Sequence, residues 1–258
     1  MIPFRVSLGD WSPVIRRIDD GQSAIALTFD DGPDPAGTPH LIATLAAAKA
    51  RASFFLCGIR VAQHPEQVQA LVDAGHDVYA HGWDHNRFAA QEGEAALQAT
   101  LRTEALLARH RPTPKPYLIR LPYNAGFTSA AIHRAMRKFD PDIQFAWWSH
   151  AIADYLIADK PRSETEVRDA CSAAVARLTQ RDDLAGGILL LHDTAITQPH
   201  EAAALTTRTL LPGLLEALAR RGLRAVALEP RAMPPAVNRF VFRTLQPYTV
   251  TPDWAHSA

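Results

Sequence analysis

Short apolar runs alternate with longer amphipathic segments along most of the chain. The apolar runs have the length of strands buried in a parallel sheet; they cover residues 24–29, 52–56, 76–80, 117–119, 144–148, 187–191 and 224–228. The segments between them have the apolar spacing of helices; they cover residues 40–48, 64–74, 93–110, 129–138, 164–178 and 202–220. This alternation predicts a parallel α/β fold, either an open sheet or a closed barrel.

No linker or internal repeat divides the chain, and its 258 residues suit one large domain. We expect an N-terminal segment over residues 1–22 and a catalytic domain over residues 23–229. Prolines then recur through residues 230–258, which predicts a C-terminal tail that wraps around the domain or frays.

The charge balance excludes some classes of partner. The 27 basic residues match the 27 acidic ones, so no overall field favours nucleic acid or an anionic membrane. No apolar run reaches transmembrane length. Two cysteines, Cys57 and Cys171, do not indicate a disulfide framework. The chain starts without the apolar segment of a signal peptide, which favours a cytoplasmic location, or a secreted or periplasmic one if a signal was removed. The oligomeric state is not indicated.

Polar residues with catalytic potential follow several of the predicted strands. Asp30 and Asp31 end the first strand, His81 the third, Arg120 the fourth and His192 the sixth. Each has an ordinary alternative, because aspartates are common in turns and a single histidine is often part of a core. The carboxyl ends of parallel barrel strands meet at one mouth, so we expect these side chains to converge on one site.

The spacing of two histidines indicates a metal site. His81 and His85 are four residues apart, and a carboxylate beside them would complete three nitrogen and oxygen ligands. Three ligands leave positions open for water and substrate, which is typical of a catalytic zinc site. The adjacent carboxylates of Asp30 and Asp31 would repel each other unless a cation, a shared proton or an arginine separated their roles.

Four of these segments resemble the motifs of the NodB-homology polysaccharide deacetylases, carbohydrate esterase family four. They are Thr28–Pro33 (TFDDGP), His81–His85 (HGWDH, with Gly82 where the family usually has Ser or Thr), Arg120–Tyr123 (RLPY) and Leu190–His192 (LLH). The resemblance spans residues 24–228. It implies a distorted (β/α)7-type barrel of parallel strands. It also implies metal-dependent removal of N-acyl groups, in the simplest case N-acetyl, from an amino-sugar glycan or oligosaccharide.

The remaining motif departs from the family pattern of Trp, Asp and then Asp-Trp. Trp148 matches its first position, Ala151 stands where the first Asp is expected, and Asp154-Tyr155 replaces Asp-Trp. In the family the first Asp supports the catalytic histidine. We therefore expect weaker support for His192 unless His150 or Asp154 takes over that role.

The resemblance also implies a role for each matching residue. Asp31, His81 and His85 would hold Zn²⁺ or another divalent transition metal. Asp30, oriented by Arg120, would be the general base, and the backbone N–H of Tyr123 would stabilise the oxyanion. His192 would protonate the leaving amine. The expected substrate contacts are Leu190 in the acyl pocket and three aromatic residues near the motifs: Trp83, Trp148 and Tyr155. Trp147 and Trp148 are adjacent, so strand alternation predicts that one of them belongs to the core.

Two other functions remain compatible with the sequence. The chain could be a deformylase or another amide hydrolase with a non-polymeric substrate, in view of the altered fourth motif. It could also be a catalytically silent glycan-binding relative, in view of Ala151. The presence of both the predicted base and the predicted acid favours an enzyme.

Overall fold

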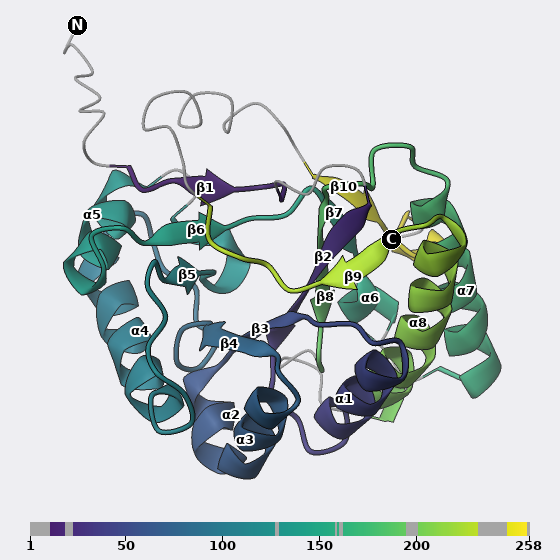
Figure 1. The fold of residues 1–258 in the computed structure, drawn as a ribbon, viewed down its shortest axis with the longest axis horizontal. Helices are drawn as coiled ribbons and strands as arrows, with labels where there is room; N and C mark the ends of the chain where they lie inside the picture. The colour runs from purple at the N-terminus through teal and green to yellow at the C-terminus, as the bar shows by residue number, and fades with distance from the viewer. Residues whose placement is uncertain are drawn as a thin grey trace, which may run out of the picture.

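The computed structural model describes residues 11–18, 23–126, 129–157, 159, 162–194, 201–231 and 247–256. Its strands occupy the middle of the molecule and its helices lie around them (Figure 1). The strands are β1 (Val14–Ile15), β2 (Ala24–Asp31), β3 (Ser53–Leu56), β4 (Asp77–Ala80), β5 (Leu118–Ile119), β6 (Gln144–Ala146), β7 (His150–Ile152), β8 (Ile188–His192), β9 (Arg224–Val226) and β10 (Tyr248–Val250). The helices are α1 (Thr38–Ala47), α2 (Gly58–Gln63), α3 (Pro65–Asp73), α4 (Gly93–Leu107), α5 (Ala130–Phe139), α6 (Asp154–Ile157), α7 (Glu164–Thr179) and α8 (Glu201–Arg220), with the short 3-10 helices η2 (Pro122–Asn124) and η3 (Asp253–His256).

The strand pairing confirms the predicted parallel α/β fold. One sheet has the order β10-β7-β8-β2-β3-β4, with β9 also pairing with β2, and a smaller sheet has the order β1-β6-β5. All these pairings are parallel. In chain order, β2 to β8 follow one another around a distorted barrel. Among the described residues, no ladder bonds join β4 to β5 or β6 to β7.

Strand β2 is the centre of the larger sheet. All its eight residues are buried, and it pairs with β3 on one side and β8 on the other. In this register Asp30 lies beside His192 of β8 and beside Phe55 of β3. The carboxyl ends of the three strands therefore coincide, as expected for a parallel barrel.

Each of the seven predicted strands is present, and three further strands were not predicted. The expected strand over residues 144–148 ends at Ala146, and β7 begins at His150. The other two lie outside the expected catalytic domain: β1 pairs with β6, and β10 extends the sheet beyond β7. The N-terminal segment and the Pro-rich tail thus both supply strands, although residues 1–10, 19–22, 232–246, 257 and 258 lie outside the described part.

The predicted helices also match the structure, and local signals explain some of their ends. Helix α7 starts with a capping box, in which the Ser163 side chain accepts from the backbone N–H of Glu166 and the Glu166 side chain accepts in return. Ser129 caps α5 by accepting from the backbone N–H of Ile132. No helix within the described ranges is long and apolar enough to span a membrane.

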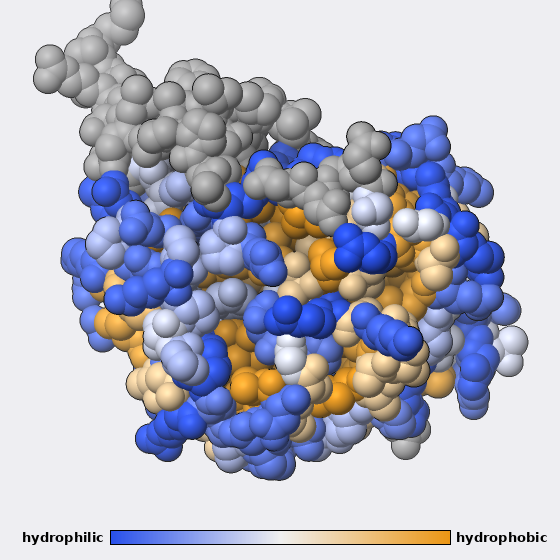
Figure 2. Space-filling view, viewed as in Figure 1, coloured by the Kyte–Doolittle hydropathy of each residue, from blue (hydrophilic) through white to orange (hydrophobic). Residues whose placement is uncertain are grey.

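A groove of about 950 Å³ lies between α1, α8 and β9. Apolar side chains show between the polar ones in the middle of this face (Figure 2), which β9 crosses in Figure 1. Strand β9 pairs with Ala24 to Ala26, at the amino end of β2. The groove therefore lies away from Asp30 and Asp31, which end this strand.

Candidate active site

The two aspartates that end β2 are both buried and both line one pocket. Neighbouring side chains in a regular strand point to opposite faces. Asp31, however, has a φ of 76°, in the left-handed region. This turn of the backbone, directly before Gly32 and Pro33, breaks the alternation, so both carboxylates reach the same side.

Asp31, His81 and His85 form a compact set of donor atoms. Asp31 Oδ1 lies 3.5 Å from His81 Nε2 and 3.2 Å from His85 Nε2, and the ligand atoms of the three residues lie within 4.8 Å of one another. Two ligands about 2.0 Å from a tetrahedral ion stand about 3.3 Å apart. The two separations from Asp31 Oδ1 therefore fit a divalent metal without rearrangement of these side chains.

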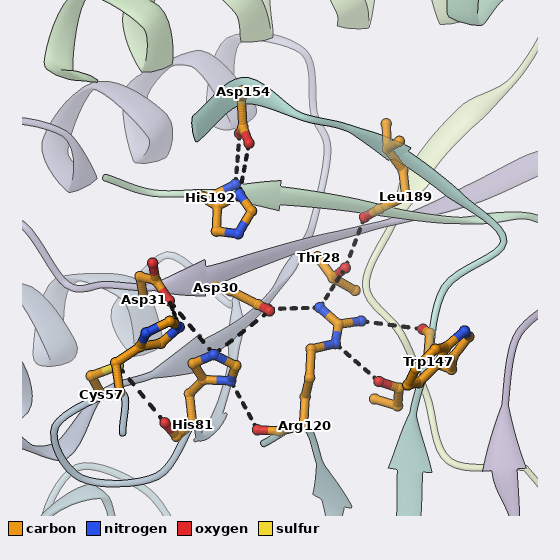
Figure 3. A network of polar contacts seen from close by, with 12 residues as sticks. Thr28, Asp30, Asp31, Cys57, His81, Arg120, Trp147, Asp154, Leu189 and His192 are labelled. Carbon is orange, nitrogen blue, oxygen red and sulfur yellow. Dashed lines mark hydrogen bonds and ion pairs between the residues drawn. The ribbon is translucent and has the colours of Figure 1, made fainter. Parts of the chain in front are cut away.

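The surroundings of the histidines leave the correct nitrogens facing Asp31. His81 Nδ1 lies 2.9 Å from the backbone oxygen of Arg120 (Figure 3), so it donates its proton there and leaves Nε2 as the ligand atom. Burial lowers the pKa of His85, although the Asp31 carboxylate acts in the opposite direction. A neutral imidazole is the form that binds metal.

The loop that carries both histidines turns at Gly82. Its φ is 70°, a conformation that favours glycine, and the Thr103 hydroxyl donates to its carbonyl oxygen. The departure from the family's usual Ser or Thr at this position therefore fits the backbone geometry.

Asp30 is held by a buried arginine instead of by the donor set. Arg120 Nη1 donates to Asp30 Oδ1 at 2.7 Å and to the Thr28 hydroxyl at 3.0 Å. The same guanidinium donates to the carbonyl oxygens of Ala146 and Trp147 (Figure 3). Burial lowers the pKa of Arg120, and the Asp30 carboxylate opposes this effect. His81 lies within 4 Å of both aspartates, but Arg120 holds Asp30 whereas His85 contacts Asp31.

Asp154 supports His192, so of the two residues considered as replacements for the missing aspartate it is Asp154 that takes over this role. Asp154 Oδ1 lies 2.6 Å from His192 Nδ1, and its Oδ2 accepts from the His192 backbone N–H at 2.7 Å (Figure 3). Burial acts to lower the pKa of His192, but Asp154, Asp31 and Asp30 together raise it to about 9. Ala151 lies in β7 beside Leu190, and its place in the motif does not need a carboxylate.

His150, the other residue considered as a replacement, lies elsewhere. Its ring contacts the Ser149 hydroxyl at 2.9 Å and Asp183 Oδ1 at 3.1 Å. It is therefore not a partner of His192.

The donor set, Asp30 and His192 surround a pocket of about 300 Å³. Its lining includes most of the predicted site residues and three that were not predicted: Asp30, Asp31, His81, His85, Tyr123, Trp148, Tyr155, Leu190 and His192, with Arg87, Leu121 and Asn124. The predicted Arg120 lies behind Asp30 and contacts the ring of Trp148. Asn124 follows directly after the RLPY motif, and this position could have predicted that it lines the pocket. No motif position predicted the same for Arg87.

Trp83 is the predicted substrate residue that the structure does not bring to this pocket. Arg102 stacks over its ring at 3.3 Å, and the ring packs against Gly58 of α2. The two adjacent tryptophans stack on each other with 4.6 Å between ring centroids. Only Trp148 of the two lines the pocket, while Trp147 lines a separate small cavity.

Backbone strain is concentrated at the pocket. Five non-glycine residues in the described ranges have a positive φ, and four of them line it: Asp31, His85, Tyr123 and Asn124. Such conformations are unfavourable for residues with a Cβ and gather at functional sites. The pocket therefore has the geometry of a preorganised site.

The comparisons with known proteins agree with the fold and the pocket. The sequence profile of the family described as polysaccharide deacetylase matches residues 17–140. The chain belongs to this family, the NodB-homology deacetylases of carbohydrate esterase family four.

Two curated relatives show how far the similarity extends. A peptidoglycan-N-acetylmuramic acid deacetylase of Bacillus subtilis is 35% identical over 43% of this chain and 24% of its own length. A peptidoglycan-N-acetylglucosamine deacetylase of Bacillus cereus is 26% identical over 82% of this chain and 89% of its own length. The chain thus spans about a quarter of the first relative and most of the second.

Solved structures support the fold alone at this level of identity. A polysaccharide deacetylase from Bacillus cereus matches with a TM-score of 0.66 and 23% identity, over 85% of this chain and all of its own. A family pseudoenzyme from Bacillus anthracis matches with a TM-score of 0.62 and 18% identity, over 84% of this chain and 68% of its own.

Proposed function

We propose that this chain is a divalent-metal-dependent hydrolase that removes N-acyl groups, in the simplest case N-acetyl, from an amino-sugar glycan or oligosaccharide. The observation that carries the proposal is the convergence of three units on one pocket. These are the Asp31, His81 and His85 donor set, the Asp30–Arg120 pair and the His192–Asp154 pair.

The donor set has the nitrogen and oxygen ligands that zinc and similar transition metals prefer. A divalent ion held there would polarise the acyl carbonyl and make a nearby water more acidic. Asp30 lies next to this set, with Oδ2 3.8 Å from His81 Nε2. Arg120 holds its other oxygen, so the carboxylate is oriented to take the proton of the attacking water.

The other face of the pocket completes the reaction. The backbone N–H of Tyr123 would donate to the oxygen that gains charge as water attacks the acyl carbon. With a pKa of about 9, His192 is protonated near neutral pH and can give its proton to the leaving nitrogen. The C–N bond then breaks, and the products are a carboxylate and a free amine.

Apolar and aromatic side chains form the remaining wall. Leu190 is buried beside His192 in β8 and is placed to contact a small acyl group. Tyr155 is 42% exposed, and its ring lies edge-on to His192 with 5.3 Å between centroids. An exposed aromatic ring at a pocket rim suits stacking against a sugar ring.

The deciding experiment measures acetate release together with metal content. We expect acetate from N-acetylated chitooligosaccharides or peptidoglycan fragments, dependent on a divalent ion. Release of formate from formylated amides without any acetate would indicate a deformylase instead. Glycan binding without acyl release would indicate a silent relative, the class to which the Bacillus anthracis pseudoenzyme belongs.

A further inference from the structure

Within the described ranges, Arg87 is the cationic residue of the pocket that has no acidic partner. It lines the pocket and is exposed. The positive charges of Arg120 and His192 are matched by Asp30 and Asp154. In the described part of the chain, by contrast, no carboxylate lies within ion-pair distance of Arg87. The nearby Asp84 instead accepts from the Asn86 side chain at 2.7 Å.

An aromatic contact holds the guanidinium at the rim. Arg87 Cζ lies 3.7 Å from the centroid of the Tyr123 ring, a cation–π arrangement. Tyr123 also contacts His85, with 4.6 Å between ring centroids. Tyr123 is itself fixed by its left-handed backbone, with a φ of 52°. The cation is therefore one aromatic ring away from the predicted metal ligands.

This arrangement leaves the hydrogen-bonding edge of the guanidinium available. Stacking uses the face of the group, whereas its N–H bonds point outward in the plane. A planar carboxylate can accept two of them at once, which makes the contact strong and directional. Arg87 thus has the form of an anion-binding group beside the reaction centre.

We propose that Arg87 selects substrates whose amino sugar, or the sugar next to it, carries a carboxylate. This inference rests on the proposed function and narrows its substrate class to acidic N-acyl glycans. Tyr123 supplies both the stacking ring for Arg87 and the proposed oxyanion donor. The carboxylate should therefore lie within about one sugar ring of the acyl group.

Two substrates that differ only in charge test the proposal. One is the peptidoglycan disaccharide of N-acetylglucosamine and N-acetylmuramic acid, whose lactyl group carries a carboxylate; the other is its methyl ester. We expect the protein to prefer the acid in kcat/KM by about tenfold or more, the size expected for charge-assisted hydrogen bonds. Arg87→Ala should bring the ratio of acid to ester close to one.

Arg102→Ala is the matched control. Arg102 is also exposed and stacks on an aromatic ring, that of Trp83, but it does not line the pocket. Its variant should keep the ratio of the unmodified protein. A ratio that is the same in Arg87→Ala as in the unmodified protein would overturn the proposal, because Arg87 would then only support Tyr123.

A binding measurement separates this proposal from the proposed function. Asp30→Asn should bind substrate without turnover. Calorimetry would compare the binding of the acid and of the ester to this variant and to the double variant that also carries Arg87→Ala. Tighter binding of the acid that is lost with Arg87→Ala supports the anion site, even if the unmodified protein releases no acetate. Equal binding of the acid and the ester refutes it, whatever the catalytic result.

Discussion

Two opposing effects set the pKa of His192, and their balance determines whether this residue can act as an acid. Burial disfavours the charged imidazolium, whereas the Asp154 carboxylate at 2.6 Å favours it. The resulting pKa of about 9 lies above that of a free histidine, about 6.5. A proton donor is therefore available across the neutral range.

We predict that Asp154→Asn moves the high-pH limb of the rate profile to lower pH. An acid must be protonated, so the rate falls as pH rises through its pKa. Removal of the carboxylate leaves the effect of burial opposed only by Asp31 and Asp30, and the pKa should fall by about one to three units. The measurement is kcat/KM against pH at equal metal content. Ala151→Ser is the control, and an unmoved limb in Asp154→Asn would contradict the role of Asp154.

Asp30 and Asp31 are adjacent in sequence but have different partners, and this predicts different variant behaviour. Asp30→Asn should retain the metal, because the donor set does not include Asp30. It should lose about 10²- to 10⁴-fold in kcat, since an amide cannot take the proton from water. Elemental analysis and steady-state kinetics test both expectations together. Loss of the metal would show that the roles of the two aspartates are reversed.

At the scale of elements, side chains replace the missing ladder bonds at the open edge of β4. Tyr117 accepts from the backbone N–H of Ala80 at 2.9 Å, and Arg111 donates to the backbone oxygen of Val78. The buried Glu104 of α4 binds both of these side chains. The residue before His81 is therefore anchored to α4 and to the segment that leads into β5.

We predict that Tyr117→Phe destabilises the protein by about 1–3 kcal/mol, because it leaves the Ala80 N–H and the Glu104 carboxylate with fewer buried partners. Denaturant unfolding measures the change. Tyr248→Phe, at a half-buried position in the edge strand β10, should cost less than about 0.5 kcal/mol. Equal effects at the two positions would show that the Tyr117 hydroxyl has no special role.

At the scale of the whole molecule, the donor set joins segments that follow different strands. Asp31 ends β2, whereas His81 and His85 follow β4. An ion that binds them would bind only the folded chain, and it would therefore stabilise the barrel by mass action.

We predict about one divalent ion per chain, as expected for a single three-ligand site. Chelation should abolish activity and lower the unfolding temperature, and His81→Ala should lose metal and activity together. Elemental analysis, kinetics and thermal unfolding with and without chelator are the measurements. Full activity of a metal-free, chelator-treated protein would refute the metal-dependent mechanism.

Much of this architecture followed from local patterns. The alternation of apolar strands with amphipathic helices predicted the parallel barrel, and the position of Asp30, Arg120 and His192 at strand ends predicted their convergence. These signals are local because parallel pairing brings all carboxyl ends to one face. The strands β1 and β10 could not be predicted, because two or three residues are too few for a periodic pattern and their pairing depends on a distant edge.

The sequence by itself determined the order of the seven predicted strands and of the helices between them, and most of the candidate residues of the site. Only the tertiary structure decided which side chains point into the pocket. It turned Trp148 inward and Trp83 away, brought Asp154 rather than Ala151 to His192, and added Arg87 to the rim. The physical reason is that loop conformation, with residues such as Asp31 and Tyr123 in the left-handed region, sets side-chain direction, and no sequence spacing encodes that direction.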